Sequence, residues 1–148
     1  MNDMTTKKKK LPVKDTFRIL SFIFVAILVT ACSKKVVFPT SEVLPAAEAV
    51  MKVDKNDNNN YVLELEIENM AKPGRLQPAR RTYVVWMVTD QHGTINIGNL
   101  NINNNNKASL ETITPYKPIR IFITAEDDQK VIVPSTQVVL NSDEFNAD

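Results

Sequence analysis

The feature that most constrains the fold is a series of short apolar segments, about ten residues apart, between residues 46 and 141. In the clearest one, 61–68, apolar residues alternate with Glu64, Glu66 and Glu68, which is typical of a strand with one face in water. Further strands are expected at 50–53, 83–88, 94–97 with a continuation to 102 past Gly98, 108–114, 119–124, 131–133 and 137–140. Turns rich in Asn, Asp or Gly separate these segments. We therefore expect an all-β chain that forms an antiparallel, immunoglobulin-like β-sandwich of seven or eight strands.

Residues 83–88 are apolar at consecutive positions, which indicates a central strand covered on both faces. We expect Trp86 to be a core residue in preference to a ligand-stacking platform. Gly98 breaks the alternation of the next strand and predicts a β-bulge. The long connection 69–82 contains Pro73-Gly74 and Pro78, and a loop of this length either crosses between sheets or carries function.

The first 31 residues have the composition of an export signal. Residues 1–18 hold six Lys or Arg against two Asp, and residues 19–29 are an apolar run. At about 1.5 Å per residue, this run is too short for a hydrocarbon core about 30 Å thick. We therefore expect 1–31 to be a signal helix that is removed from the mature protein.

The only cysteine, Cys32, follows Val29, Thr30 and Ala31, and this order resembles the lipobox of bacterial lipoprotein precursors. The resemblance implies signal cleavage between Ala31 and Cys32 and lipidation of Cys32 by diacylglycerol and a further acyl chain such as palmitate. Several acyl chains anchor a protein stably in a membrane lipid layer. An ordinary secretory signal with an incidental cysteine and an uncleaved anchor helix are the alternatives.

The same resemblance implies a lipid-anchored protein of the bacterial cell envelope. Ser33 is not the aspartate that retains lipoproteins in the inner membrane, which favours the outer membrane, facing the periplasm. We expect 32–45 to be a lipidated tether and 46–148 to be the β-sandwich domain. Residues 32–148 contain 12 Lys or Arg and 15 Asp or Glu, so the electrostatic basis for nucleic-acid binding is missing.

Four features of the sandwich segment occur in a recognisable order: Tyr83-Val-Val-Trp86, Gly98, Ile123-Thr-Ala-Glu126 and the closing segment 134–140. This order resembles the periplasmic C-terminal domain of anti-sigma-K factors over about residues 45–141. The resemblance implies a β-sandwich with a sensing or protein-binding role in the periplasm. Sigma-factor binding does not carry over, because the 31 residues before Cys32 are interpreted as a signal.

Chemistry-bearing residues are few, and we predict no catalytic, cofactor-binding or metal-binding site. His92 is the only histidine, and it lies in a predicted turn, so a Ser-His-Asp hydrolase would depend on it alone. The glutamates of 61–68 could hold calcium with help from a neighbouring strand. Pairing with a basic residue across the sheet is favoured instead, and the candidates are Arg80, Arg81 and Arg120. We expect Glu126-Asp127-Asp128 to be a solvated turn.

These observations predict a non-enzymatic, membrane-anchored lipoprotein that binds or scaffolds another envelope component, with an envelope protein as its partner. One alternative is a carbohydrate-binding module that uses Tyr61, Tyr116 or Trp86, with amides from 58–60 and 103–106. The other is an envelope enzyme with a carboxylate site. An exposed Trp86 would favour sugar binding, converging carboxylates would favour an enzyme or ion site, and an ordered 69–82 loop would favour a protein partner.

Overall fold

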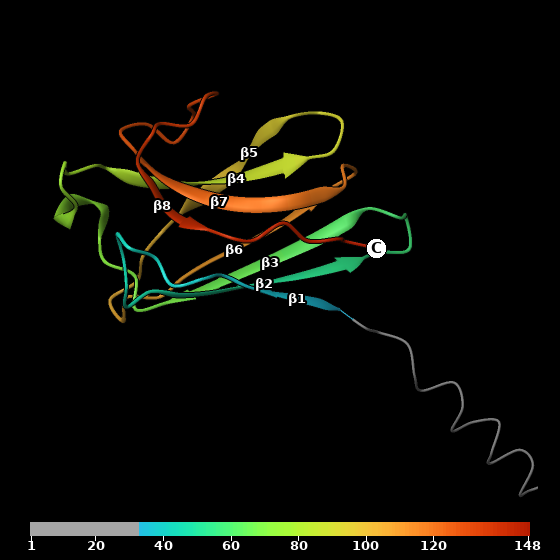
Figure 1. Ribbon diagram of the computed structural model, residues 1–148, viewed down its shortest axis with the longest axis horizontal. Coiled ribbons are helices and arrows are strands. Elements are labelled where there is room, and N and C mark those ends of the chain that lie inside the picture. Colours follow the sequence, from blue (N-terminus) through green and yellow to red (C-terminus); the bar gives the residue numbers. More distant parts are fainter. Residues whose placement is uncertain (1–32) are drawn as a thin grey trace, which may run out of the picture. The chain divides into compact units, whose positions relative to one another are not determined.

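The computed structural model describes residues 33–148. The predicted signal helix, the cleavage site after Ala31 and the lipidation of Cys32 lie outside these residues. The described chain is an antiparallel β-sandwich of two four-stranded sheets (Figure 1). Its elements are β1 (Lys34–Val37), β2 (Glu48–Lys55), β3 (Tyr61–Glu68), the 3-10 helix η1 (Pro73–Arg75), β4 (Thr82–Thr89), β5 (Thr94–Leu100), β6 (Ala108–Thr114), β7 (Pro118–Glu126) and β8 (Val138–Asn141). Within residues 33–148, no helix is both long and apolar enough to span a membrane.

The sheet topology confirms the immunoglobulin-like prediction. The first sheet has the order β1-β2-β3-β6 and the second has the order β5-β4-β7-β8. Apart from β1, the orders β2-β3-β6 and β4-β7-β8 match strands A-B-E and C-F-G of the immunoglobulin fold. Strand β5 pairs with the outer edge of β4, at the position of strand C′ in variable-type domains. The chain therefore crosses between the sheets after β3, β5 and β6.

The predicted tether is wrong where the structure describes it, because residues 34–37 form strand β1 at the edge of the first sheet. Val36 pairs with Met51 of β2, and the Phe38 amide donates a hydrogen bond to the Ala49 carbonyl at 3.0 Å. Val36, Phe38 and Leu44 are buried in the core. A tether would leave their apolar surface in water, so its burial favours a domain that begins at residue 33.

The main core lies between the two sheets. Strand β3 confirms its predicted alternation, since its odd-numbered residues are buried while Glu64, Glu66 and Glu68 are exposed. The second sheet contributes alternate residues of its two central strands, β4 and β7, to this core. The largest fully buried members from these three strands are Leu63, Leu65, Ile67, Tyr83, Met87, Ile121 and Ile123.

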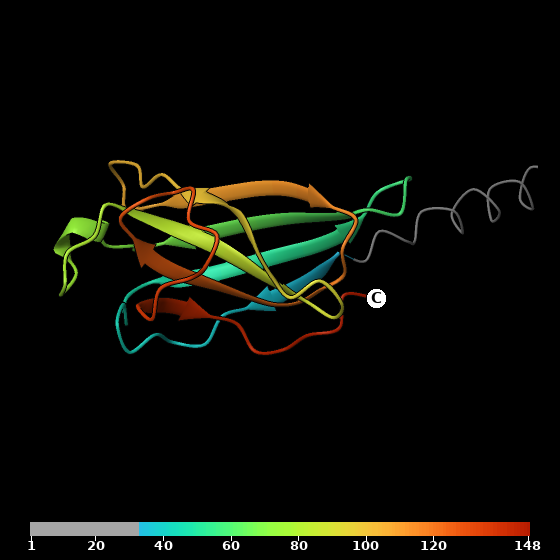
Figure 2. The ribbon, with the colours of Figure 1, turned by 90° about the horizontal axis from the view of Figure 1, so that it is seen from above.

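Strand β4 is covered on both faces, as its composition predicts. Its outward residues Val84 and Trp86 form a second small core with Phe122 of β7. Val131, in the loop between β7 and β8, packs against this core. Trp86 is 0% exposed, and its ring stacks on that of Phe122 with centroids 6.2 Å apart. Figure 2 shows the 127–137 loop lying over this sheet.

The strand predicted at 131–133 is wrong, because these residues lie in an irregular loop. The carbonyl of Val131 accepts a hydrogen bond from the Asn96 side chain at 2.9 Å instead of entering a sheet ladder. The free edge of β7 is taken by β8. Ile132 and Val133 are consequently left at the surface.

Gly98 confirms the predicted bulge. Val85 pairs with Gly98 and Trp86 pairs with Asn96, so Ile97 is the extra residue. Gly98 has φ +144°, a backbone conformation that residues with a side chain rarely adopt. A Cβ at this position would lie 2.9 Å from Leu110 Cδ1 of β6. The glycine thus allows both the bulge and the close approach of β5 to β6.

Candidate binding surface

The three glutamates of β3 pair with lysines that lie on β2 or directly before β6, the strands on either side of β3. Lys52 Nζ of β2 lies 3.6 Å from Glu64 and 3.7 Å from Glu66, and Lys107 pairs with Glu68. The prediction that Arg80, Arg81 or Arg120 pairs with these glutamates is therefore wrong. These arginines belong to β7 or to the connection leading into β4, in the opposite sheet, whereas the neighbours of β3 are β2 and β6.

The residues considered for a catalytic or metal site do not converge within residues 33–148. In this part of the chain, no group of three or more His, Asp, Glu or Cys side chains is placed to hold a metal ion. The ring of His92 lies against that of Tyr116, with centroids 4.2 Å apart. The His92 amide donates to Thr89 Oγ1 at 2.8 Å, which fixes the turn between β4 and β5.

The aromatic residues considered for sugar binding do not form a platform either. Trp86 is buried, Tyr61 is buried, and Tyr116 is exposed beside His92. The asparagine runs form turns: the side-chain oxygens of Asn56 and Asn103 accept hydrogen bonds from amides of their own turns at 2.9–3.0 Å. An exposed Trp86 would have favoured carbohydrate binding, but Trp86 is a core residue.

Glu126 corrects the prediction of a solvated 126–128 turn, because it is the buried last residue of β7. Its Oε1 accepts hydrogen bonds from the Thr124 hydroxyl at 2.5 Å and from the Ser135 amide at 2.8 Å. Thr124 Oγ1 in turn accepts a hydrogen bond from Trp86 Nε1 at 2.7 Å. This buried polar chain fixes both ends of the 127–137 loop to the second sheet.

The 69–82 loop is ordered by packing and hydrogen bonds. Met70 and Leu76 are buried in the main core. The Tyr83 hydroxyl donates to the Ala71 carbonyl at 2.9 Å, and the Arg80 amide donates to the Pro73 carbonyl at 3.1 Å. Burial raises the pKa of Tyr83 to about 12, so this phenol stays a donor at neutral pH.

The 69–82 and 127–137 loops are joined by Arg80 and Gln137. Arg80 Nε donates to Gln137 Oε1 at 2.8 Å, and the Arg80 guanidinium pairs with Asp127 at 2.6 Å. Gln137 Nε2 donates to the Pro78 carbonyl at 3.1 Å. Figures 1 and 2 place both loops toward the end of the sandwich opposite the start of β1. We call this pair of loops the two-loop platform.

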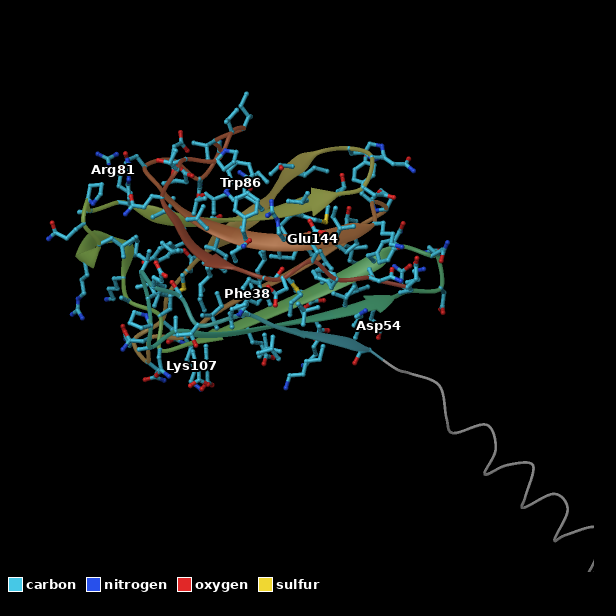
Figure 3. All side chains as sticks on the ribbon, viewed as in Figure 1. Phe38, Asp54, Arg81, Trp86, Lys107 and Glu144 are labelled. Atoms are coloured by element: carbon cyan, nitrogen blue, oxygen red, sulfur yellow. The ribbon has the colours of Figure 1, made fainter. Side chains whose placement is uncertain are left out.

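The platform presents cations and aliphatic side chains to solvent. Lys72, Arg75 and Arg81 are exposed, and no residue within 33–148 forms a salt bridge with them. Ile132 is 88% exposed and Val133 is 71% exposed. Figure 3 labels Arg81 at this end and Asp54 at the other. Exposed aliphatic residues and unpaired charges on two joined loops are the composition of an interaction surface.

Sequence reasoning identified the 69–82 loop but missed the surface that it forms. The four basic residues of this loop are visible in the sequence, yet Arg80 and Arg81 were predicted only as partners of the β3 glutamates, and the other two were assigned no role. Ile132 and Val133 were assigned to a strand, which concealed their exposure. No protein-family model, curated protein or solved structure matches the chain, so the resemblances to lipoprotein precursors and to anti-sigma-K factors stay predictions.

Proposed function

We propose that this protein is a lipid-anchored envelope lipoprotein whose β-sandwich binds another envelope component through the two-loop platform. The observation that carries the proposal is the ordered junction of two loops by Arg80 and Gln137. A rigid sandwich that presents fixed loops is a common way to build a binding surface, because the loops lose little freedom when a partner binds. The activity is binding, without a chemical step.

The anchor rests on the residues Val29 to Cys32, which match the requirements of lipoprotein processing. Cys32 lies two residues before the start of β1, and the platform lies toward the opposite end of the sandwich. An eight-residue strand such as β4 spans about 25 Å. A lipid on Cys32 would therefore leave the platform accessible to partners beyond the lipid surface, which is the arrangement that a scaffolding lipoprotein needs.

Acyl labelling tests the anchor. Cells that express the full chain are grown with a labelled fatty acid, and the Cys32→Ala variant is compared with a Ser33→Ala control. Cys32→Ala should lose the label and the membrane association, because no other thiol exists in the chain. Ser33→Ala should keep both. Equal labelling of Cys32→Ala and wild type would disprove lipidation at this residue.

Site-specific photo-crosslinking in intact cells tests the binding surface. A photoreactive amino acid is placed at Arg75 on the platform or, as a control, at Glu111 on the exposed face of β6. A discrete adduct should form from position 75 and not from position 111. The same adducts from both positions, or none from position 75, would contradict binding through the platform.

A further inference from the structure

We infer that the platform binds an acidic protein segment, one that presents several carboxylates together with an aliphatic side chain. The inference rests on the proposed function and adds the chemistry of the partner. The supporting observations are the charge of the two loops, the exposed aliphatic residues, and the position of the platform on the domain.

The charge of the platform is opposite to that of the domain. Residues 33–148 contain 12 Lys or Arg and 15 Asp or Glu, an excess of negative charge. The two loops reverse this balance, because their acidic residues are Asp127 and Asp128 while their basic residues are Lys72, Arg75, Arg80, Arg81 and Lys130. A basic patch on an otherwise acidic domain attracts an acidic partner and orients its approach.

Only part of this positive charge is used inside the domain. Arg80 is held by Asp127 and Gln137, so it braces the loops. Arg75 and Arg81 remain exposed on segments that are fixed by η1 and by the hydrogen bond from the Arg81 amide to the Glu126 carbonyl at 3.0 Å. A guanidinium with a fixed backbone suits bidentate pairing with a carboxylate.

The aliphatic residues favour a protein segment over a simple anion. Ile132 and Val133 follow Val131, which packs on the Trp86 cluster, and precede Ser135, whose amide is bound by Glu126. Both neighbours are therefore fixed while the two side chains between them face solvent. Covering these side chains requires an apolar group on the partner, which phosphate or an acidic glycan does not supply.

The position of the platform favours a protein over a lipid headgroup. Anionic headgroups share the charge of a carboxylate, and exposed aliphatic residues also suit a bilayer. The platform, however, lies toward the end of the sandwich opposite the start of β1, which follows the proposed lipid attachment (Figure 2). An anchored chain can therefore hold this surface up to about one strand length, roughly 25 Å, from its own bilayer, where a protein partner can reach it.

The inference is tested with full-length protein in detergent micelles and three probes. The probes are a synthetic peptide of alternating Glu and Leu, a peptide of the same length with Glu and Ser, and phosphatidylglycerol vesicles. The platform variant is Arg75→Glu/Arg81→Glu. The matched control is Lys34→Glu/Lys35→Glu, which changes the net charge equally at the edge strand β1, whose start lies at the other end.

The Glu-Leu peptide should bind the wild type best, and the platform variant should lose at least about tenfold in affinity while the β1 variant loses less than about twofold. Affinity should also fall as NaCl rises from about 50 to about 200 mM, because exposed charges are screened. Ile132→Ser should weaken binding of the Glu-Leu peptide more than that of the Glu-Ser peptide. Equal losses in both double variants, or vesicles that compete better than the Glu-Leu peptide, would overturn the inference.

Crosslinking in cells separates this inference from the proposed function. The photoreactive residue is placed at Val133, in the wild type and in the platform variant. Loss of a wild-type adduct in the variant supports an acidic protein partner. An adduct that persists unchanged overturns the inference and leaves the proposed function standing, whereas the absence of any adduct from both position 133 and position 75 contradicts both.

Discussion

Thr124→Val should destabilise the domain because it removes the central member of the buried polar chain. Thr124 is fully buried, accepts a hydrogen bond from Trp86 Nε1 at 2.7 Å and donates one to Glu126 at 2.5 Å. The variant leaves the indole N–H buried without its partner, at a cost of about 1–3 kcal/mol, and removes a bond to a carboxylate worth about 1.5–3 kcal/mol. Valine fills nearly the same volume, so little is added by packing. We expect a loss of about 2.5–6 kcal/mol in the free energy of unfolding.

The assay is urea unfolding followed by the fluorescence of Trp86, which is the only tryptophan in the chain. With a slope of about 2 kcal/mol per molar urea, the midpoint should fall by about 1 M or more. Thr112→Val, at a half-buried position of β6, is the control and should change stability by less than about 0.5 kcal/mol. Equal midpoints for the two variants would refute the role assigned to the polar chain.

Three further predictions concern other contacts. Gly98→Ala should lower the urea midpoint by an amount equivalent to about 1–3 kcal/mol, since it strains φ and crowds Leu110; an unchanged midpoint would contradict this. The Tyr83 phenol, with its pKa raised to about 12, should titrate near that pH in absorbance at 295 nm, and stability should fall as pH rises above about 10 because the unfolded phenol ionises first. Contacts with Lys117, Lys55 and Tyr61 hold the pKa of Asp148 below its ordinary value. Asp148→Asn should therefore be less stable than wild type at neutral pH, and the difference should shrink as pH falls below about 4; a constant difference would exclude this linkage.

The strands with a clear pattern could be predicted from the sequence. β3 alternates along its whole length, and the continuous apolar run of β4 marks a central strand. β1 escaped prediction because Val36 is its only buried residue, and nothing local distinguishes it from a linker. Its strand conformation comes from pairing with β2, whose partner residues are more than ten positions away.

The candidate surface could be predicted only in part, for a similar reason. The length and prolines of 69–82 indicated a functional loop, but its junction with 127–137 depends on Arg80 and Gln137, which are 57 residues apart. Glu126 was expected in water because it precedes two aspartates. Its burial depends on Ser135, nine residues later, whose amide satisfies the carboxylate. Such contacts follow from the tertiary fold and have no local signature.

The edge strand β1 also limits how far the domain could move from an anchor at Cys32, the proposed site of lipidation. Lys34 is already paired with Val53, so Ser33 alone separates Cys32 from a hydrogen-bonded sheet. One extended residue adds about 3.5 Å of slack, whereas a free fourteen-residue leash would reach roughly 45 Å. With the proposed lipid on Cys32, a molecule that meets the platform would therefore have to come within about one domain length of that lipid, and the domain could not search a larger volume to find it.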